Sequence, residues 1–595
     1  MTLGMGKRQI SKIIWLETIL IGIISLVVGL IVGVFGSQFM SILVAKMFEA
    51  DMSKFQFVFS EAACVKTCVY FAIMYILVLI FNTISISRYK LIDLITATKK
   101  NEQIKLKNPV LCIIVFIMAV IMLIYAYYKV TIGVHTLTTA EKIFPIIIIG
   151  TIATFLVFWS LSGFILRLVQ ARPKIYLKNT NMFVLRQLNN KINTTVVSMT
   201  VICLMLFMTI TILSSALSLR NTMQKDLKEM TPVDINLYKK ANIPFDDNDY
   251  TDIAKDDSRI TVQETLKKYN FDLNKLKDVV EIPIYATDEL TWADTLGDTF
   301  KEAKATFSML RYDTAEEIIK VSDYNKIAKL YGIQEYNLND NEYMILCDFD
   351  NMKSLRDKAL AQNTQIEIAG QKYYPKYKNC QSGYIYMSTS HVNVGIILVP
   401  DSCNLTEDMK ETTFLAANYN VNTEEEKQEI EDILTSDESE FINNLNKNQI
   451  YLTGLSKISI IESSVGLATI IVFVAIYLGI IFLIASSAIL ALKQLTESSD
   501  NKERYVILRK IGADEKMINM ALFKQIGIFF MIPLIFAIIH SIFGIQFGIE
   551  MMSGLASSKD LLPSIIATVI IIGVVYGLYF WATYNGSKRI IKNID

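Results

Sequence analysis

The chain has 595 residues, of which 52% are apolar and 19% are charged. This balance is too hydrophobic for an ordinary soluble protein. The 58 basic and 58 acidic residues cancel, so the chain lacks the basic excess that is typical of nucleic-acid-binding proteins, and no nucleic-acid partner is expected.

Eight apolar segments are each long enough to cross a bilayer, which takes about 20 residues. In chain order they are residues 13–35, 67–87, 109–128, 145–167, 196–217, 464–492, 520–548 and 563–583. The first segment is long and leads into further apolar segments, so it does not have the pattern of a cleavable signal peptide. The sequence therefore predicts a polytopic α-helical membrane protein with about eight transmembrane helices.

The first and seventh segments belong to an internal repeat. Residues 3–36 and 511–544 align without a gap, and the alignment pairs Gly4 with Gly512 and Gly36 with Gly544. In both copies a short basic stretch is followed by an apolar helix, a loop and a second apolar helix. A helix pair repeated at each end of the chain predicts two halves that act against each other in the membrane.

Charge is divided unevenly along the chain. Residues 220–455 hold 26 Lys and Arg against 42 Asp and Glu, so the remainder has a basic excess, which lies in alternate loops between the apolar segments. The positive-inside rule places such basic loops in the cytoplasm. We therefore expect a plasma-membrane protein with both termini in the cytoplasm and residues 220–455 outside the cell.

Residues 220–455 are numerous enough to form a domain with its own core. Alternating apolar residues such as Ile366 and Ile368 predict strands, and Thr423 followed by Glu426 predicts a capped helix start. We expect a large mixed α/β extracellular domain. The expected divisions are 1–95, a first unit with the repeated helix pair, incomplete at its N-terminus because no helix precedes it as one precedes the second copy; 96–195, central helices and cytoplasmic loops; 196–219, a transmembrane stalk helix; 220–455, the extracellular domain; and 456–595, a second unit with the repeated helix pair.

Motifs for catalysis or cofactor binding are not found in the sequence, which has no phosphate-binding loop, nucleophile elbow, zinc-protease helix or paired-cysteine motif. No enzymatic activity, cofactor or metal is expected of this chain. Three cysteines, Cys347, Cys380 and Cys403, lie in the expected extracellular domain. One disulfide with a free thiol and three reduced thiols both remain open.

Polar residues inside the apolar segments are candidates for function. Glu17 and Gln525 occupy the same position in the two copies of the repeat. Each is expected either to form hydrogen bonds between helices or to transmit motion. His540 is expected to be a packed helix residue rather than a proton relay.

Four stretches of this sequence resemble the FtsX-like permease family, and within it the bacitracin-type, BceB-like permeases of ABC transporters. They are LGMGKRQISKIIWLETILIG, RYKLIDLI, MFVLRQLNNKINTTVVSMTVICLMLFMTITILSSAL and KERYVILRKIGADEKMINMALFKQ. The resemblance covers all eight segments and the position of the large domain between the fifth and sixth. Such permeases usually have ten spans, so the resemblance implies that the first two transmembrane helices are missing from this chain.

The resemblance also implies a partner and a mechanism. An ABC permease without a nucleotide site needs a separate ATPase subunit, expected to be a dimer. Lys7, Arg8, Arg509 and Lys510, in the short basic segments, are the candidate residues that couple to it.

The implied function is resistance to, or sensing of, peptide antibiotics of the bacitracin or lantibiotic type at the outer face of the membrane. The expected ligand is a peptide antibiotic or a lipid-linked cell-wall intermediate. Two alternatives remain, a sensory partner of a membrane histidine kinase and a permease for lipoprotein or lipid export.

Overall fold

The computed structural model describes residues 7–47, 57, 59–88, 109–137, 139–170, 173–178, 180–307, 310–551 and 561–592. The chain forms two compact units. The first, which we call the helical unit, comprises Met1–Leu217, Thr469–Met551 and Leu561–Asp595. The second, which we call the sheet unit, comprises Ser218–Ala468.

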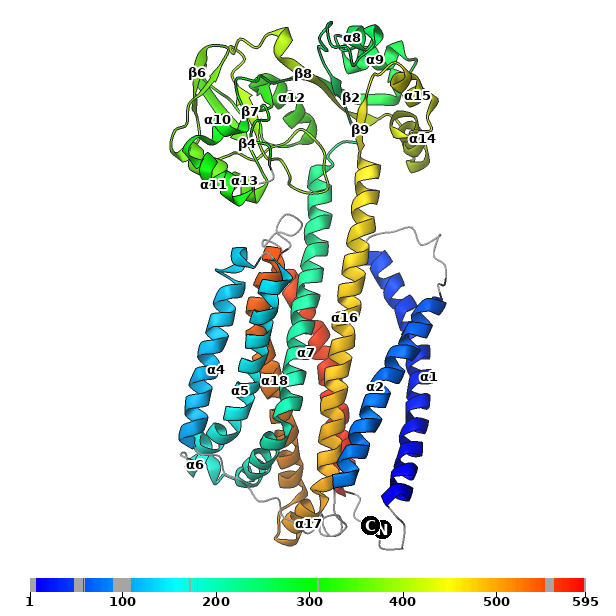
Figure 1. Cartoon of the computed structure of the whole chain (residues 1–595), viewed down its shortest axis with the longest axis vertical. Coiled ribbons are helices and arrows are strands. Elements are labelled where there is room, and N and C mark those ends of the chain that lie inside the picture. The colour runs from blue at the N-terminus through cyan, green and yellow to red at the C-terminus, as the bar shows by residue number, and fades with distance from the viewer. Residues whose placement is uncertain are drawn as a thin grey trace. The chain divides into compact units, whose positions relative to one another are not determined.

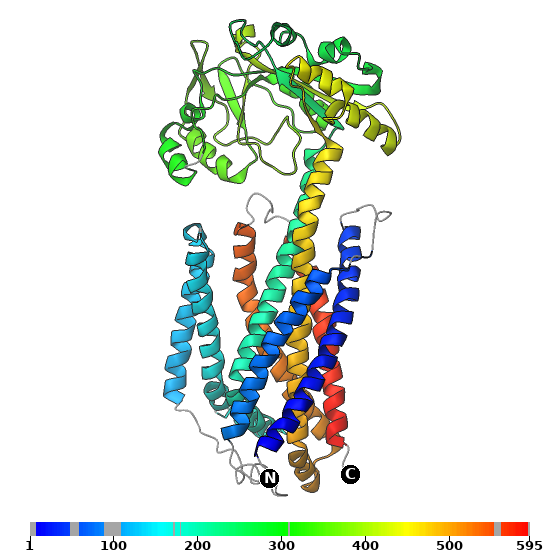
Figure 2. The same ribbon diagram turned by 45° about the vertical axis from the view of Figure 1, so that its right-hand side comes forward.

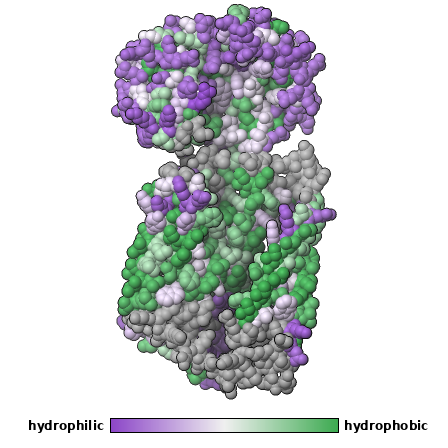
Figure 3. Space-filling view, viewed as in Figure 1, coloured by the Kyte–Doolittle hydropathy of each residue, from purple (hydrophilic) through white to green (hydrophobic). Residues whose placement is uncertain are grey.

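Eight helices in the described part of the chain are long and apolar enough to span a membrane (Figure 1). They are α1 (Lys7–Met47), α2 (Glu61–Arg88), α4 (Pro109–Val130), α5 (Ala140–Gln170), α7 (Asn181–Met230), α16 (Lys457–Asp500), α18 (Glu515–Met551) and α19 (Leu561–Lys592). The surface over these helices is largely hydrophobic, as Figure 3 shows in green. The predicted class, a polytopic α-helical membrane protein with about eight spans, is confirmed.

Shorter elements complete the helical unit. They are the helices α6 (Pro173–Tyr176) and α17 (Lys502–Lys510) and the 3-10 turn η2 (Val134–Thr136). Gly512 follows α17 with a φ of 96°, a left-handed conformation that glycine adopts without strain. The chain can therefore turn sharply from α17 into α18.

The sequence repeat corresponds to two similar helix pairs. In the first, Tyr75 of α2 donates a hydrogen bond to the carbonyl of Thr18 in α1, at 2.5 Å. In the second, Tyr576 of α19 donates to the carbonyl of Phe530 in α18, at 2.8 Å. Gly22 aligns with Phe530, and a Cβ at Gly22 would lie 2.4 Å from the Tyr75 ring. Each pair is thus held by a tyrosine, with glycine making room for it in the first copy.

Helix α7 packs closely on two other long helices through glycines. A Cβ at Gly479 of α16 would lie 2.7 Å from Leu213 of α7. A Cβ at Gly544 of α18 would lie 2.5 Å from the ring of Phe207, also in α7. Small residues allow the backbones of membrane helices to approach in this way.

The sheet unit is built on a mixed sheet, with nine strands among the described residues, in the order β5-β6-β4-β7-β3-β2-β8-β1-β9. Most neighbours are antiparallel, whereas β3 with β7 and β4 with β6 are parallel. The strands are β1 (Ile235–Lys240), β2 (Leu276–Tyr285), β3 (Ile318–Lys320), β4 (Glu342–Leu346), β5 (Ile366–Ile368), β6 (Gln371–Pro375), β7 (Ile396–Val399), β8 (Lys410–Tyr419) and β9 (Thr453–Ser456).

Helices cover both faces of this sheet. Successive residues of a strand point to opposite faces, so each strand contributes to a core on either side. In β8, Phe414 and Ala416 pack in the same core as α12, whereas Leu415 and Ala417 pack with α9 and α14. The predicted cap of α14 is present, since the Thr423 side chain accepts from the backbone N–H of Glu426. The helices are α8 (Asp252–Asp257), α9 (Val262–Lys268), α10 (Trp292–Leu296), α11 (Phe300–Thr306), α12 (Val321–Tyr331), α13 (Asp350–Ala361), α14 (Glu424–Thr435) and α15 (Glu440–Lys447), with 3-10 turns η3 (Leu273–Lys275), η4 (Gly297–Thr299) and η5 (Glu407–Met409).

Candidate functional site

The sheet unit contains a cavity of about 400 Å³, which is within the size range of small-molecule sites. Its wall combines the last residue of α7, the first residue of α10, the segment that precedes β3, the segment that precedes β7, and β8. The lining residues are Met230, Trp292, Thr314, Ala315, Glu317, Tyr384, Ile385, Tyr386, Ser388, Val392, Asn393, Val394, Gly395, Ile396 and Glu411. Apolar and aromatic side chains therefore make up much of the wall.

Two carboxylates, those of Glu317 and Glu411, are the charged groups of this lining. The Tyr386 hydroxyl donates a hydrogen bond to Glu317 Oε1 at 3.1 Å. Burial, with a smaller contribution from the charges of Glu411 and Glu316, raises the pKa of Glu317 to about 7, against the lowering effect of the Tyr386 hydrogen bond. Within the described residues, no basic side chain forms an ion pair with Glu317 or Glu411.

Glu316 and Glu317 are consecutive, and their side chains lie in different environments because successive side chains of an extended chain point to opposite sides. Glu317 lines the cavity, whereas Glu316 forms a bidentate ion pair with Arg356 of α13, with N–O distances of 2.8 and 3.1 Å. Both of these side chains are 0% exposed. Arg356 Nε also donates to the carbonyl of Val394 at 2.7 Å, which fixes one wall of the cavity.

The segment before β7 has no regular secondary structure, yet its backbone is held at several points. Tyr331 donates to the carbonyl of Ile385 at 2.7 Å. The buried Asn236 accepts from the N–H of Met387 at 2.8 Å. Asn393 donates to the carbonyl of Gly383 at 2.9 Å. These bonds shape the cavity wall in advance of any ligand.

His391, in the same segment, lies among three carboxylates at the edge of this region. Its Nδ1 is 2.9 Å from Asp348 Oδ2, and its Nε2 is 3.6 Å from Glu229 and 3.9 Å from Asp226. The hydrogen bond to Asp348 raises the pKa of His391, and the charges of all three acids add to this effect against desolvation. Asp226 and Glu229 belong to the last turns of α7, so His391 joins that helix end to the sheet.

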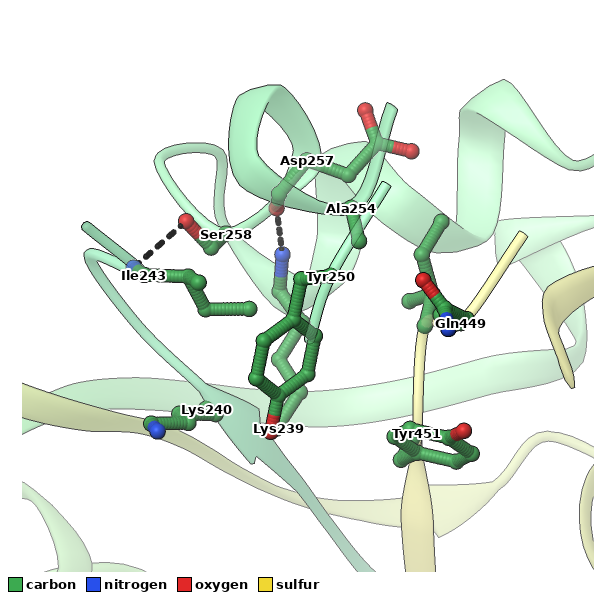
Figure 4. Close-up of a pocket in the computed structure, with 10 residues that line it drawn as sticks. Lys239, Lys240, Ile243, Tyr250, Ala254, Asp257, Ser258, Gln449 and Tyr451 are labelled. Atoms are coloured by element: carbon green, nitrogen blue, oxygen red, sulfur yellow. Dashed lines mark hydrogen bonds between the residues drawn. The ribbon is translucent and has the colours of Figure 1, made fainter. Parts of the chain in front are cut away.

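A second, smaller hollow lies between β1 and α8 (Figure 4). Its volume is about 30 Å³, and Lys239, Tyr250, Asp257 and Gln449 are among its lining residues. The ammonium of Lys239 donates to the backbone carbonyl of Asp257, and burial lowers the pKa of Lys239 to about 8. This space is suited to about one water molecule rather than to an organic ligand.

The two predicted coupling segments lie at the same end of the helical unit, as Figures 1 and 2 show for the start of α1 and for α17. Lys7 and Arg8 begin α1, but their side chains fall outside the described part, as does Gly4 of the repeat. Arg509, the last but one residue of α17, pairs with Glu515 at 2.5 Å, while its Nη1 donates to the carbonyl of Ile591 at 3.0 Å.

Lys510, in contrast, is exposed. Its neighbours Ile507 and Ile511 are also exposed, by 58% and 72%. The turn between α17 and α18 therefore presents a basic and apolar surface to which Arg509 contributes little.

The intramembrane polar residues have different surroundings. Gln525 is buried and accepts a hydrogen bond from Tyr505 of α17 at 2.8 Å, which ties α17 to α18. Glu17 is exposed on α1. His540 contacts helices α4 and α5, because its Nδ1 is hydrogen-bonded to Tyr127 and its Nε2 lies 3.2 Å from Thr154 Oγ1.

The cysteines of the sheet unit, Cys347, Cys380 and Cys403, are free thiols in this structure. The thiols of Cys347 and Cys380 are neighbours, and their hydrogen bond lowers the pKa of Cys347 and raises that of Cys380. Among the described residues, no three His, Cys, Asp or Glu side chains are placed to hold a metal ion.

The cavity residues were missed by sequence reasoning. Glu317, Tyr386 and Glu411 come from three separate segments, and none forms a recognisable motif with its neighbours. The sequence signal that could have indicated this site is the pair Glu316–Glu317 directly before an apolar strand. Acidic residues in that position lie close to the core of a sheet, where charged groups need partners.

Comparison with known proteins gives similarity along the whole chain. Residues 1–94, which include α1 and α2, match the family model described as FtsX-like permease C-terminal. The chain is 24% identical over 602 residues to an uncharacterized ABC transporter permease, YvcS, of Bacillus subtilis, covering 99% of this chain and 85% of the relative. It is 23% identical over 606 residues to the bacitracin export permease protein BceB of Halalkalibacterium halodurans, with 99% and 86% covered. For BceB of Bacillus subtilis the identity is 21% over 607 residues, with 99% and 85% covered.

Proposed function

We propose that this chain, an ABC transporter permease of the FtsX-like, BceB-related type, protects a bacterial cell from peptide antibiotics that attack lipid-linked cell-wall intermediates. A separate ATPase subunit, expected as a dimer, supplies the energy. The whole-length similarity to two proteins named as bacitracin export permeases supports the proposal. The observation that carries it is the sheet unit itself, a large domain with a ligand-sized cavity, inserted between two spanning helices.

The sheet unit is proposed to lie outside the cell and both termini in the cytoplasm. The acidic composition of residues 220–455 and the basic loops elsewhere support this orientation through the positive-inside rule. The proposed functional divisions of the chain remain 1–95, 96–195, 196–219, 220–455 and 456–595. In this arrangement, α7 and α16 are the elements that pass from the membrane into the extracellular domain.

The proposed ATPase contact is the end of the helical unit that carries α17 and the start of α1. Lys7, Arg8, Arg509 and Lys510 lie there in sequence, and the exposed apolar surface at Ile511 supports a docking role. The ATPase would shift α17, and Tyr505 would pass that shift to Gln525 in α18 through their buried hydrogen bond. Glu17, exposed on α1, is proposed to contact neighbouring polar groups at the same membrane depth.

The test is the susceptibility of cells to peptide antibiotics. Deleting the gene should lower the growth-inhibiting concentration of bacitracin-like or lantibiotic peptides, and the full-length gene should restore it. Unchanged peptide susceptibility with defective lipoprotein sorting would replace this proposal by lipoprotein export. Lost induction of resistance with intact resistance of the induced state would instead assign the chain to sensing beside a histidine kinase.

A further inference from the structure

We propose that the cavity of about 400 Å³ in the sheet unit binds an organic cation, a primary ammonium group carried on an apolar chain, between Glu317 and Glu411. The proposed function enters this inference at one point only: it identifies the source of the cation as a basic side chain of a peptide antibiotic.

The charged groups of the cavity lining favour a cation as the ligand. The lining holds two carboxylates and no Lys, Arg or His. Glu317 Oε1 accepts a hydrogen bond from the Tyr386 hydroxyl, which carries no charge. Two neighbouring carboxylates without a cation repel each other and are costly to keep ionised. An ammonium group between them would remove that cost.

The rest of the lining suits a cation that is carried on an apolar chain. Trp292, Tyr384 and Tyr386 supply aromatic rings, and Met230, Val394 and Ile396 supply apolar surface. Aromatic faces attract cations, whereas aliphatic walls suit the methylene chain that carries an ammonium. Among the described residues no group of three His, Cys, Asp or Glu side chains could hold a metal ion, so the lining suits an organic cation better than a metal ion.

The cavity is open to solvent on one side and has a fixed backbone on another part of its wall. Glu411, Thr314 and Val392 are exposed, so the cavity opens to solvent on their side. The backbone at Val394 is fixed by Arg356, whose charge is already satisfied by Glu316 in a bidentate pair. A preformed site with an open rim can admit a side chain at a small entropic cost.

The ionisation of Glu317 gives the inference a distinctive signature. Because burial raises its pKa to about 7, the carboxyl is partly protonated at neutral pH and mostly ionised at pH 8. An aliphatic ammonium stays charged over this range. Binding should therefore strengthen as the pH rises from 6 to 8, and this dependence should require Glu317.

The experiment uses the full chain in lipid nanodiscs and the fluorescent amine dansylcadaverine. Trp292 is the only tryptophan between residues 218 and 468, and Trp15, Trp159 and Trp581 lie elsewhere in the chain, so the part of the energy transfer that is lost in Trp292→Phe reports occupation of the cavity. Dansylamide, which lacks the ammonium, is the control ligand. We expect saturable binding of the amine, at least tenfold weaker binding in Glu317→Gln at pH 8, and weaker binding in Glu411→Gln. The Glu411 side chain is exposed, so this second variant is expected to fold.

Glu425→Gln is the matched control variant, because Glu425 is exposed on α14 and its replacement removes the same charge from the sheet unit. It should bind the amine as the unaltered protein does. Equal binding of dansylamide and dansylcadaverine, or unchanged amine affinity in both cavity variants, would overturn the inference.

Cell assays separate the inference from the proposed function. If gene deletion sensitises cells to peptides but Glu317→Gln neither binds the amine differently nor alters susceptibility, the cavity inference fails and the proposed function stands. If the amine binds in a Glu317-dependent way but deletion leaves peptide susceptibility unchanged, the cavity inference stands and the proposed function fails.

Discussion

Replacing Arg356 by methionine should destabilise the sheet unit strongly at neutral pH. The substitution leaves Glu316 fully buried without its cation, since the 2.8 and 3.1 Å contacts are both lost. Glu316 can escape by taking up a proton. A glutamate has an ordinary pKa of about 4.3, so at pH 7 protonation costs about 4 kcal/mol, at about 1.4 kcal/mol per pH unit. This value agrees with the roughly 3 to 5 kcal/mol typical of a broken buried ion pair.

The destabilisation of the Arg356→Met variant should depend on pH. In the variant, the folded state keeps Glu316 protonated while the unfolded state releases the proton, so the penalty grows as pH rises above about 4.3. It should fall to about 1 kcal/mol at pH 5. Hydrogen–deuterium exchange of β4 and β7 peptides in the full chain measures both values. The double variant Arg356→Met with Glu316→Gln should recover much of the loss at pH 7.

A single Arg356→Met variant that is as stable as the unaltered protein at pH 7 would refute this reasoning. So would a penalty that stays constant between pH 5 and pH 7. In either case the Arg356–Glu316 pair would contribute through packing or not at all.

Two further predictions concern the two ends of the long helices. The pKa of His391 is raised in the folded state. Its ion pairs therefore stabilise the end of α7 fully below about pH 6.5, and this stabilisation is lost as the pH rises through the folded-state pKa of His391. Since the side chain is 37% exposed, screening by solvent limits the stabilisation to about 1 kcal/mol. Exchange protection of residues 220–230 should thus fall between pH 6 and 8.5, and a His391→Gln variant that shows the same fall would contradict the assignment. At the other end, Lys510→Glu should weaken ATPase copurification modestly while leaving α17 folded, whereas Arg509→Glu should also loosen α17, because Arg509 pairs with Glu515. Unchanged recruitment in Lys510→Glu would place the ATPase contact elsewhere.

The spanning helices could be predicted because their signal is local. A run of about 20 apolar residues identifies itself without reference to the rest of the chain, and the same holds for the Thr423 cap of α14. The repeat was also visible, although its structural counterpart, the tyrosines at 75 and 576, was not, because the two residues do not align with each other.

The cavity could not be predicted, because it depends on long-range contacts. In sequence, Arg356 looks like one more charged residue of an amphipathic helix, and only the fold shows that it faces the core and binds Glu316. Glu317 and Glu411 are 94 positions apart and meet only because the segment before β3 and strand β8 line the same space. The role of Gln525 likewise required Tyr505 to be placed against it.

Helix α7 has mechanical properties that follow from its length and composition. Its 50 residues extend about 75 Å, whereas the hydrocarbon of a bilayer is about 30 Å thick. The sequence of α7 contains no glycine and no proline, the usual sites of helix kinks, while α16 contains Gly466 and Gly479. Helix α7 thus lacks the two residue types at which a helix bends most readily, whereas α16 has two glycines. Of the two long helices that connect the units in sequence, α7 should therefore resist bending more than α16.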